Sequence, residues 1–443
     1  MMLDRIPKEE LQGALEIVKT LRGRGFQALF AGGAVRDLLI GRPVKDIDIA
    51  TSAAPDEVEQ IFPRTVAVGK AFGVIRVLIG GRGYEVATFR ADLGYKDGRR
   101  PSGVRFVEDR EDAMRRDFTV NALFLDPVDE EVIDFVGGRA DLDAGIIRAV
   151  GEPDLRFQED RLRIMRAVRF AVELGFRLDS RTSEAIRNHA GSILCISWER
   201  IRDELLKILA SPSPHAGLDL MTDYGLLEQV LPEVEAMKGV EQPPQFHPEG
   251  DVYTHTRLML KISGGGLDPV LAMGILLHDV GKPGSFKVRE RIRFDGHAEL
   301  GAKIAERICA RLRISGHATR RIVSLVREHL RFIPVREMRE STLKRFIRMD
   351  DFKDHLELHR LDCLASHGNL ENYEFCREML EKFSSEEVKP APLISGKDLI
   401  EMGFDPGPRF AEILERVEDL QLEGSLTGRQ EALEFVRREF VAH

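Results

Sequence analysis

The first 150 residues carry short runs in which hydrophobic and polar positions alternate, and glycine pairs separate several of these runs. Alternation with a period of two is typical of half-buried strands, and glycines between such runs are typical of turns. A helix over residues 1–28 is expected to precede them. We therefore predict a mixed sheet with helices over residues 29–150.

Beyond residue 150 the apolar positions follow the spacing of amphipathic helices. Breaks are expected at Gly175, at Gly191 and at the SPSPH stretch that begins at Ser211. The stretch EQPPQFHPEGD, residues 241–251, indicates a linker. The predicted fold class is α+β, with a mixed N-terminal sheet followed by all-helical regions. The predicted domains are residues 1–150, 151–245, 246–370 and 371–443.

Candidate metal chemistry begins in the segment DIDIA. Asp46 and Asp48 are separated by one apolar residue, so on a strand both carboxylates project from the same face. Such a pair suits a hard cation, and Mg²⁺ held by one or two carboxylates plus substrate phosphates is the commonest arrangement. The bare pattern also fits an exposed strand beside a turn, because short carboxylate motifs occur by chance.

A glycine turn precedes this pair. Gly32 and Gly33 let the backbone approach a triphosphate closely, and Arg36 follows to meet it. The glycine turn, Arg36 and the carboxylate pair together predict chemistry on a nucleoside triphosphate. They suit a two-metal displacement, in which one ion activates the attacking hydroxyl and the other stabilises the leaving pyrophosphate.

Further segments recur downstream in a fixed order. They are GGAVRD at Gly32–Asp37, EVATFR at Glu85–Arg90, RRDFTVNAL at Arg115–Leu123, EDRLRIMRAVRFA at Glu159–Ala171 and ERIRDELLKIL at Glu199–Leu209. In composition, order and spacing they resemble the class II tRNA nucleotidyltransferase and poly(A) polymerase family. The resemblance covers at least residues 29–209 and implies a catalytic nucleotidyltransferase head over 1–150, in which Asp46 and Asp48 are catalytic and bind Mg²⁺. It also implies a neck over 151–245 that selects the nucleobase and binds RNA.

The segment Glu159–Ala171 carries Asp160, Arg163, Arg166 and Arg169 at three-residue steps, which on one helix form a winding stripe. An aspartate accepts from an exocyclic amine and an arginine fork donates to ring acceptors. The resemblance implies that Asp160 and Arg163 act as a protein template selecting CTP and ATP, and that Arg166 and Arg169 bind phosphates. Taken alone, an arginine-rich helix is more often a solvated basic face.

Other positions follow from the resemblance. Arg116, with Asp117 and Asn121, is expected to contact the phosphate and sugar of the nucleotide, and Gly33 and Arg36 belong to the same nucleotide site. Glu85 is either a third carboxylate near the metals or an exposed strand residue. The polar, glycine-rich stretch over residues 90–112 is expected to be a mobile loop. In the family a loop here supports the switch from C to A addition, and its full length argues against a CC-only enzyme.

Histidines and aspartates are spread over the region that follows Tyr253, in YTHTRLML, ILLHDVGKP, RFDGHAELGA, REHL and LHRLDCLAS. His278 and Asp279 are adjacent and follow the apolar run LAMGILL, which indicates a buried helix that ends at a site. Imidazoles with carboxylates suit a transition-type divalent ion. The pattern resembles the HD phosphohydrolase superfamily, which implies a second divalent metal of unspecified identity in residues 246–370. The implied ligands are His255, His278, Asp279 and Asp362, with His297 and His329 as extra ligands or phosphate contacts.

Composition agrees with an intracellular enzyme of several domains. The 443 residues are 43% hydrophobic and 31% charged, and the acidic N-terminal stretch does not resemble a signal peptide. No apolar run is long enough to span a bilayer, and the four cysteines form no CxxC. We expect a cytoplasmic protein with reduced thiols and no membrane partner.

The net charge of −9 disfavours nonspecific polyanion binding, yet arginines cluster over 156–177, 311–331 and 336–348. We therefore predict a basic stripe that binds tRNA, no DNA partner, and an RNA-holding helical tail over 371–443.

The predicted function is template-independent addition of C and/or A from CTP and ATP to a tRNA 3′ end, with release of pyrophosphate, and a possible HD phosphohydrolase activity. An A-adding enzyme and a poly(A) polymerase are the alternatives within the family, although VGKAFGVIRVL at Val68–Leu78 departs from the arginine-rich stretch of bacterial poly(A) polymerases. The alternative of another class is an HD phosphohydrolase whose head only binds RNA.

Overall fold

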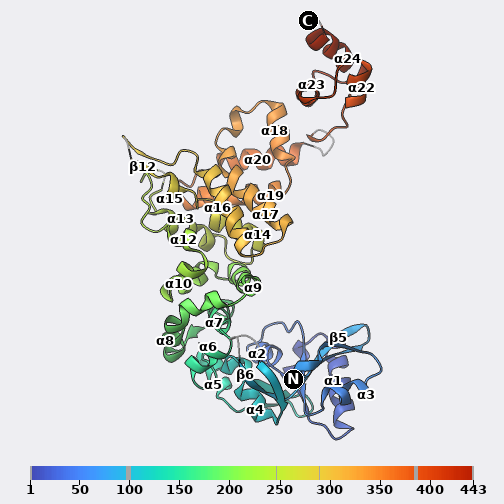
Figure 1. The fold of residues 1–443 in the computed structure, drawn as a ribbon, viewed down its shortest axis with the longest axis vertical. Helices are drawn as coiled ribbons and strands as arrows, with labels where there is room; N and C mark the ends of the chain where they lie inside the picture. The colour runs from blue at the N-terminus through green and yellow to red at the C-terminus, as the bar shows by residue number, and fades with distance from the viewer. Residues whose placement is uncertain (1, 96–100, 246, 289, 384–387, 442–443) are drawn as a thin grey trace. The chain divides into compact units, whose positions relative to one another are not determined.

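The computed structural model describes residues 2–95, 101–245, 247–288, 290–383 and 388–441. The chain divides into two compact units. Unit 1 comprises Met1–Glu235, Gly264–Leu267 and Arg311–Ile314, and unit 2 comprises Ala236–Ser263, Asp268–Ala310 and Ser315–His443. Unit 1 holds the only large sheet of the described residues, and unit 2 is almost entirely helical (Figure 1). The predicted α+β class is confirmed, while the four predicted domain boundaries stay a prediction.

The head of unit 1 is built on a seven-stranded sheet with the order β3-β4-β5-β2-β1-β8-β9. Neighbouring strands pair antiparallel except β2 and β5, which are parallel. The strands are β1 Ala28–Ala31, β2 Asp48–Thr51, β3 Thr65–Gly69, β4 Val74–Ile79, β5 Arg82–Thr88, β8 Leu123–Asp126 and β9 Glu131–Asp134. Side chains from several strands, including Leu29, Ala50 and Phe124, form one buried cluster that holds the sheet in place.

The remaining elements of unit 1 are mostly short helices and 3₁₀ turns. The helices are α1 Lys8–Arg22, α2 Gly33–Leu39, α3 Pro55–Ile61, α4 Asp109–Met114, α5 Gly138–Ala144, α6 Pro153–Glu159, α7 Arg163–Leu174, α8 Ser180–His189, α9 Trp198–Leu209, α10 Pro214–Asp223, α11 Leu226–Val230 and α12 Pro232–Glu235. The 3₁₀ turns are η1 Met2–Arg5, η2 Lys70–Phe72, η3 Thr119–Asn121 and η4 Ala190–Cys195, and β10 Ile146–Ile147 pairs with β11 Arg177–Leu178.

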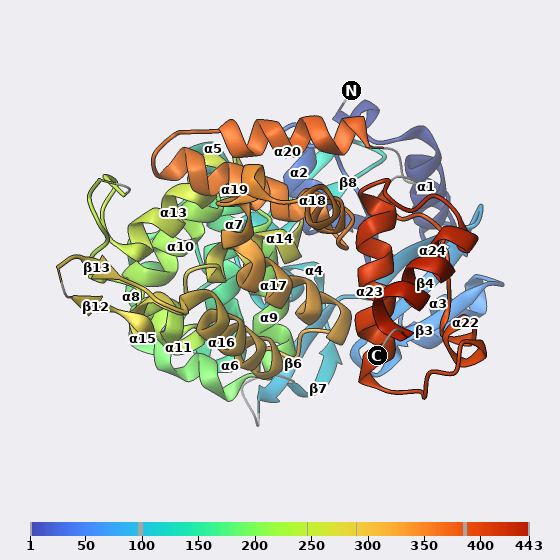
Figure 2. The same ribbon diagram turned by 90° about the horizontal axis from the view of Figure 1, so that it is seen from above.

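Two expectations for the head are wrong. The leading helix does not extend over residues 1–28, because α1 ends at Arg22 and Gly25 takes a positive φ of 88° before β1 begins at Ala28. The stretch over residues 90–112 is not a loop in its described part. It forms an antiparallel ribbon of β6 Arg90–Tyr95 and β7 Pro101–Phe106, separate from the main sheet (Figure 2). Residues 96–100, at its tip, lie outside the described residues.

The helical breaks are largely as predicted. α7 ends at Gly175, which adopts a left-handed conformation with φ 72°. α9 ends just before the SPSPH stretch, and α10 begins within it at Pro214. Gly191 lies inside η4 rather than between two helices. The stripe from Asp160 to Arg169 is not on one helix, because α6 ends at Glu159 and α7 begins at Arg163. Asp160 therefore lies in the break, in extended backbone with φ −137° and ψ 103°.

Unit 2 contains the HD region and a C-terminal group of helices. Its helices are α13 Val252–Ile262, α14 Pro269–Leu277, α15 Lys282–Ser285, α16 His297–Arg311, α17 Gly316–Glu328, α18 Glu340–Ile347, α19 Phe352–Ala365, α20 Glu371–Lys382, α22 Gly396–Glu401, α23 Pro408–Leu422 and α24 Arg429–Val436. Short turns at η5 His329–Phe332, η6 Val335–Glu337 and Arg437–Val441 complete it, and β12 Lys287–Val288 pairs with β13 Ile292–Arg293 as a ribbon that projects from the helices (Figures 1 and 2).

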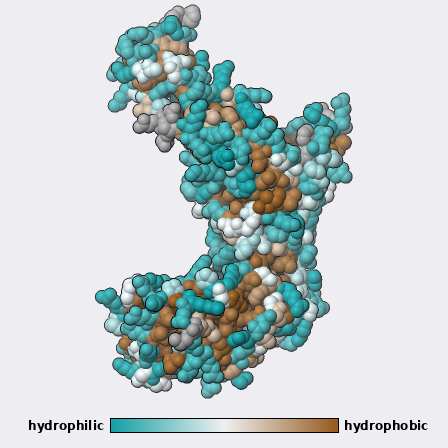
Figure 3. Space-filling view, turned by 180° about the vertical axis from the view of Figure 1, so that it is seen from behind, coloured by the Kyte–Doolittle hydropathy of each residue, from teal (hydrophilic) through white to brown (hydrophobic). Residues whose placement is uncertain are grey.

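The surface of both units is mixed. On the face drawn in Figure 3 hydrophilic side chains predominate, and hydrophobic ones gather in separate patches. Among the described residues, the helices are all too short or too polar to cross a lipid bilayer. Several arginines of the basic clusters are paired with acids, as Arg311 is with Glu233 at 2.7 Å and Arg345 with Glu418 at 2.7 Å. The predicted basic stripe stays a prediction.

Candidate functional site

A polar pocket of about 480 Å³ lies in unit 1. It collects residues from the glycine turn, β2, the segment after α4, and α7. The lining residues are Gly32, Gly33, Arg36, Asp48, Arg115, Arg116, Asp117, Asn121, Asp160, Arg163, Arg166, Arg169 and Phe170. All the predicted nucleotide-binding residues therefore share one cavity with Asp48. Asp46 is not among the lining residues and is exposed beside it.

β2 begins at Asp48, so Asp46 lies two residues before the strand and not on it, contrary to the prediction. The predicted alternation of burial is confirmed. Ile47 and Ile49 are buried, whereas Asp46 and Asp48 are exposed. Ile49 pairs with Val86 on the parallel strand β5, so Glu85 is placed beside Asp48. The protein around Asp48 displaces enough water to raise the pKa of its carboxyl to about 6, and the charges of Glu85 and Asp46 act in the same direction while Arg116 opposes them. Crowded carboxylates of this kind are a donor set that suits a divalent cation.

The turn before α2 brings the backbone close to Arg116. Gly32 has a φ of 68°, and a Cβ added there would lie 3.1 Å from Arg116 Nη1. Arg116 is held by the buried carboxylate of Asp112, with Nη2 at 3.0 Å from Oδ2, and it donates to the Asn121 carbonyl at 3.1 Å. Asp112 also accepts from Arg115 at 2.6 Å. The site thus needs both a glycine at 32 and a buried acid that sequence reasoning missed.

Other residues that line the pocket hold two further arginines, Arg36 and Arg166, in place. Arg36 donates to Asn121 Oδ1 at 2.7 Å, and Arg166 donates to Asp117 Oδ2 at 2.5 Å. Burial alone would raise the pKa of Asp117, but the Arg166 guanidinium lowers it to about 2. Asp117 and Asn121 therefore orient these arginines directly. Arg36 also contacts Asp37, with Nε at 2.9 Å and Nη2 at 2.8 Å from Oδ1, so all three of its guanidinium nitrogens have protein partners. Arg166 contacts Asp117 through Nε and Nη2.

The predicted base-reading pair lies at the same pocket, although its members do not share a helix. Asp160 accepts from Arg200 on α9, with Nη2 at 2.8 Å and Nη1 at 3.2 Å from its two oxygens. Arg163 donates to Glu159 at 2.7 Å and to the Arg115 carbonyl at 3.0 Å. Both side chains are thus tethered to the protein at the edge of the cavity.

Arg169 forms the deepest ion pair of the pocket. Its Nε donates to Glu204 Oε2 on α9 at 2.6 Å, and its Nη1 donates to Glu173 Oε2 at 2.6 Å. The Glu204 side chain is 4% exposed and that of Glu173 is 38% exposed. The two contacts have equal lengths but different surroundings, so they contribute unequally to stability.

We expect Glu204→Gln to lower the stability of unit 1 by about 2 kcal/mol, because Arg169 then keeps a buried charge with one exposed partner. The melting temperature measured by scanning calorimetry should fall by about 4 °C or more. Glu173→Gln removes an equally short but exposed contact and is the matched control, with an expected loss of at most about 1 kcal/mol. Equal losses in the two variants would contradict the assignment of Glu204 as the main support of Arg169.

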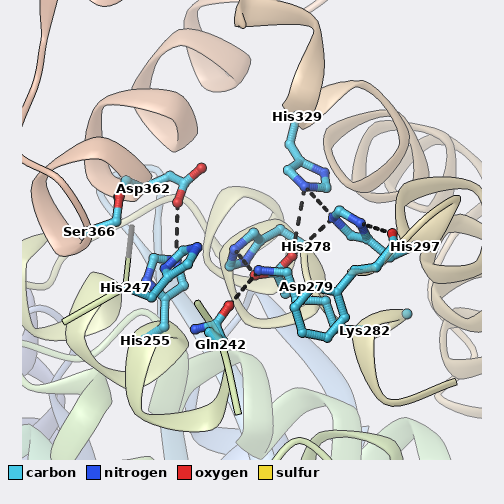
Figure 4. A network of polar contacts seen from close by, with 12 residues as sticks. Gln242, His247, His255, His278, Asp279, Lys282, His297, His329, Asp362 and Ser366 are labelled. Carbon is cyan, nitrogen blue, oxygen red and sulfur yellow. Dashed lines mark hydrogen bonds and ion pairs between the residues drawn. The ribbon is translucent and has the colours of Figure 1, made fainter. Parts of the chain in front are cut away.

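A second cluster of polar side chains lies in unit 2, where α13, α14 and α19 meet. His255 from α13, His278 and Asp279 at the end of α14, and Asp362 from α19 point into a common space (Figure 4). Ligand atoms of His255, His278 and Asp279 lie within 4.8 Å of one another, and His255 Nε2 is 3.1 Å from Asp362 Oδ1. The four predicted ligands are thus brought together, and α14 is buried and ends at the site as expected.

His297 and His329 form a second group around the same aspartate. Asp279 Oδ2 is 3.1 Å from His278 Nε2, whereas Asp279 Oδ1 is 3.3 Å from His297 Nε2 and 3.8 Å from His329 Nε2. Each carboxylate oxygen of Asp279 therefore faces a different set of imidazoles. Among the described residues, sets of three candidate ligand atoms within 4.8 Å occur only in this region of unit 2, and not at Asp46 and Asp48.

In His278, His297 and His329 the hydrogen bonds determine which ring nitrogen remains available to bind a ligand. The Nδ1 atoms of His278, His297 and His329 each donate to a backbone carbonyl, at 2.8, 2.8 and 2.7 Å. The Nε2 atoms of neutral rings then carry lone pairs, and those of His297 and His329 face each other at 3.2 Å. Facing acceptors are favourable only with a proton or cation between them. The buried His278 Nε2 and Asp279 Oδ1 also lack a hydrogen bond, so the donor set fits a metal.

The sequence analysis did not identify two residues that support this cluster, Lys282 and Glu249. Lys282 donates to Asp279 Oδ2 at 2.6 Å and to Gln242 at 2.6 Å. Glu249 accepts from His255 Nδ1 at 2.6 Å and, with Asp362, raises the pKa of His255 to about 9 against the effect of burial. The signal for Lys282 was its three-residue spacing from Asp279 in HDVGK, because the turn between α14 and α15, closed by the Lys282 amide on the Asp279 carbonyl at 2.9 Å, brings the two residues together. Glu249 lies in the predicted linker and had none. Phe246, in that linker, lies outside the described residues.

Three family models match separate parts of the chain. They are described as "Poly A polymerase head domain" over residues 28–148, "Probable RNA and SrmB- binding site of polymerase A" over 175–238, and "HD domain" over 252–353. The chain is 43% identical over 275 residues to the CCA-adding enzyme of Latilactobacillus sakei subsp. sakei, and the match covers 61% of this chain and 68% of that enzyme. The chain belongs to the family of CCA-adding enzymes. The resemblance inferred from the sequence motifs is confirmed.

Other family members extend the comparison. The CCA-adding enzyme of Lactiplantibacillus plantarum is 47% identical over 240 residues, but this match covers only 54% of this chain and 58% of that enzyme. The chain therefore spans somewhat more than half the length of such curated CCA-adding enzymes. The crystal structure of the Bacillus stearothermophilus CCA-adding enzyme in complex with CTP has a TM-score of 0.73 at 30% identity, covering 98% of this chain and 99% of that one.

Proposed function

We propose that this protein is a template-independent nucleotidyltransferase that adds C and A from CTP and ATP to the 3′ end of tRNA and releases pyrophosphate. The observation that carries the proposal is the pocket of unit 1, where arginines for a triphosphate, a base-reading Asp and Arg pair, and Asp48 line one cavity. Membership of the CCA-adding family supports the substrates, since a relative was solved with CTP.

The protein's own residues have separate tasks in this reaction. Arg36, Arg116, Arg166 and Arg169 bind phosphate oxygens, because four guanidinium groups converge on the cavity. Asp160 accepts from the exocyclic amine of the base, while Arg163 donates to its ring acceptors. These contacts hold the triphosphate in line for attack by the tRNA hydroxyl, and positioning of this kind supplies most of the acceleration in phosphoryl transfer.

Asp46 and Asp48 would hold Mg²⁺, with Glu85 as a neighbouring carboxylate. The crowding of these acids, which raises the pKa of Asp48, fits a divalent ion. When bound, Mg²⁺ supplies neutralisation of charge on the triphosphate and a lower pKa for the attacking hydroxyl.

Three tRNA substrates test the proposal. They lack all of CCA, lack CA, or lack only A, and each is given CTP and ATP separately and together before the 3′ ends are sequenced. Complete CCA on the first substrate is the expected result. Addition of A to the third substrate alone would identify an A-adding enzyme, addition that stops at CC a CC-adding enzyme, and long adenosine tails a poly(A) polymerase. No incorporation would favour a head that only binds RNA.

The Mg²⁺ requirement should depend on pH. A pKa of about 6 means that Asp48 is ionised above pH 6 and protonated below it, so protons compete with the metal at low pH. We expect the Mg²⁺ concentration for half-maximal incorporation to be constant above about pH 7 and to rise about tenfold per unit below pH 6. Titrations at pH 5.5, 6.5 and 7.5 measure this. A flat profile across these values would contradict the role of Asp48 as a metal ligand.

We further propose that unit 2 is a metal-dependent phosphohydrolase. The specific observation is the set of buried imidazole nitrogens and carboxylate oxygens that face one another without hydrogen bonds. His255, His278, Asp279 and Asp362 would hold one divalent ion, and His297 and His329 extend the set. Bound metal supplies an activated water for hydrolysis. The adjacent cavity of about 790 Å³, lined by Arg291, Arg293 and Phe294 among others, has room for a nucleotide end.

The partners and location follow from the proposed reaction. We propose tRNA as the macromolecular partner and the cytoplasm as the compartment, because the substrates CTP, ATP and tRNA meet there. The C-terminal helices α22–α24 share a hydrophobic core of their own, which suits the proposed role as an RNA-holding tail.

A further inference from the structure

Helix α9 carries a side chain that contacts the pocket without lining it. Arg200 forms a two-pronged contact with Asp160, with Nη2 at 2.8 Å from Oδ2 and Nη1 at 3.2 Å from Oδ1. The guanidinium and carboxylate therefore meet as a fork, the geometry that fixes direction as well as distance. Arg200 lies outside the set of residues that line the cavity.

The backbone gives Asp160 little orientation of its own. It follows the last residue of α6, precedes α7 by three residues, and has extended φ and ψ. Its Oδ1 accepts from the Leu162 amide at 3.1 Å, but Oδ2 has Arg200 as its partner. A side chain in a helix break keeps several rotamers unless a neighbour selects one. The direction of Oδ2 thus depends on α9.

Helix α9 also supports a second pocket residue, Arg169, through a side chain whose charge is opposite to that of Arg200. Glu204, one turn after Arg200, accepts from Arg169 at 2.6 Å. By contrast, Arg202 on α9 donates to its neighbour Asp203 at 2.7 Å and to the Arg313 carbonyl, away from the pocket. Helix α9 therefore presents one cation to the base-reading carboxylate and one anion to a phosphate-binding guanidinium.

We propose that Arg200 is a positioning residue that sets the discrimination between bases with an exocyclic amine and bases with a carbonyl at that position. The inference rests on the proposed nucleotidyltransferase function. C and A present an amine donor where U and G present a carbonyl acceptor. A carboxylate fixed by Arg200 accepts from the amine through its remaining lone pairs and repels the carbonyl oxygen. A carboxylate that is free to rotate neither accepts consistently from the amine nor consistently repels the carbonyl. The selection of C over U and of A over G should therefore weaken together.

Arg200→Met tests this, since it keeps the apolar stem of the side chain and removes the fork. Incorporation by the full-length protein is measured on tRNA lacking CCA with CTP or UTP, and on tRNA ending in CC with ATP or GTP. We expect the kcat/KM ratios of CTP over UTP and of ATP over GTP to fall by about tenfold or more. The KM for CTP should rise more than kcat at saturation falls, because the metal and phosphate contacts remain.

Arg202→Met is the matched control. The two arginines lie on the same helix, and their side chains are 23% and 24% exposed. Arg202→Met should keep the wild-type ratios. Arg200→Lys, which keeps the charge but loses the fork, should recover part of the discrimination and serves as the deciding variant if Arg200→Met does not fold by circular dichroism.

The outcomes separate the two levels of the proposal. If the wild type adds no nucleotide to any tRNA, the proposed function fails and the role of Arg200 with it. If the wild type adds CCA but Arg200→Met keeps both ratios, only the role of Arg200 is overturned. An equal loss with all four nucleotides would also overturn it, because support of the fold alone does not distinguish an amine from a carbonyl.

Discussion

Asp48→Asn should reduce nucleotide incorporation by about a thousandfold or more, which corresponds to roughly 4 kcal/mol of lost transition-state stabilisation. Asn has nearly the shape of Asp, so β2 and its pairing with β5 should persist. The substitution removes the negative charge of Asp48, which together with Asp46 and Glu85 would hold Mg²⁺ against the triphosphate. Single-turnover incorporation of CTP into tRNA lacking CCA measures the effect.

Asp56→Asn is the control for Asp48→Asn. Asp56 is an exposed acid of the same head that pairs with Lys70 and does not line the pocket, so the loss of its charge should leave incorporation unchanged. The metal content of unit 2 should be the same in both variants. Full incorporation by Asp48→Asn would contradict a metal site at β2 and would move the catalytic carboxylate elsewhere in the pocket.

Asp279→Asn is expected to abolish metal binding in unit 2 while incorporation of CTP and ATP continues. The two oxygens of Asp279 face both groups of imidazoles, so its charge contributes to two of the three candidate ligand sets among the described residues. Burial by itself would raise its pKa, but the neighbouring His278 imidazole and the Lys282 ammonium lower the pKa well below the usual range, so the carboxylate is ionised at neutral pH. Loss of this charge should reduce bound Mn²⁺ by at least about tenfold.

The metal content is measured by mass spectrometry after loading with Mn²⁺ and gel filtration, and hydrolysis of a 2′,3′-cyclic nucleotide is followed in parallel. His355→Gln is the matched control, because His355 is a buried histidine of α19 that contacts Ser324 and lies outside the cluster. It should keep the metal. Equal metal content in wild type and Asp279→Asn would overturn the metal-dependent hydrolase, and retained metal without hydrolysis would leave unit 2 as a structural metal site.

Local patterns were predictable because their physical causes act within a few residues. The alternation in DIDIA requires only that a strand point successive side chains to opposite faces, and Ile47 and Ile49 are buried as expected. The end of α7 at Gly175 requires only a residue that tolerates a left-handed conformation. The apolar run before His278 is long enough for a buried helix and too uniform for a surface one.

The errors occurred where distant segments decide the local structure. Three-residue spacing was compatible with one helix through Asp160, but the chain breaks between α6 and α7, and both segments still contribute to the pocket. The stretch over residues 90–112 is polar and glycine-rich, yet β6 and β7 pair with each other. Strand pairing depends on a partner strand, so composition alone could not distinguish this ribbon from a loop.

The sequence alone was sufficient to identify the head, the HD region and the residues that line the pocket of unit 1 or form the cluster of unit 2, because ordered motifs specify these within short windows. Only the tertiary structure revealed how those side chains are oriented. Asp112 holds Arg115 and Arg116, Arg200 holds Asp160, and Glu204 holds Arg169. The last two contacts join residues 40 and 35 positions apart. A charged residue at such a separation has many possible partners, and burial in the folded chain selects one of them.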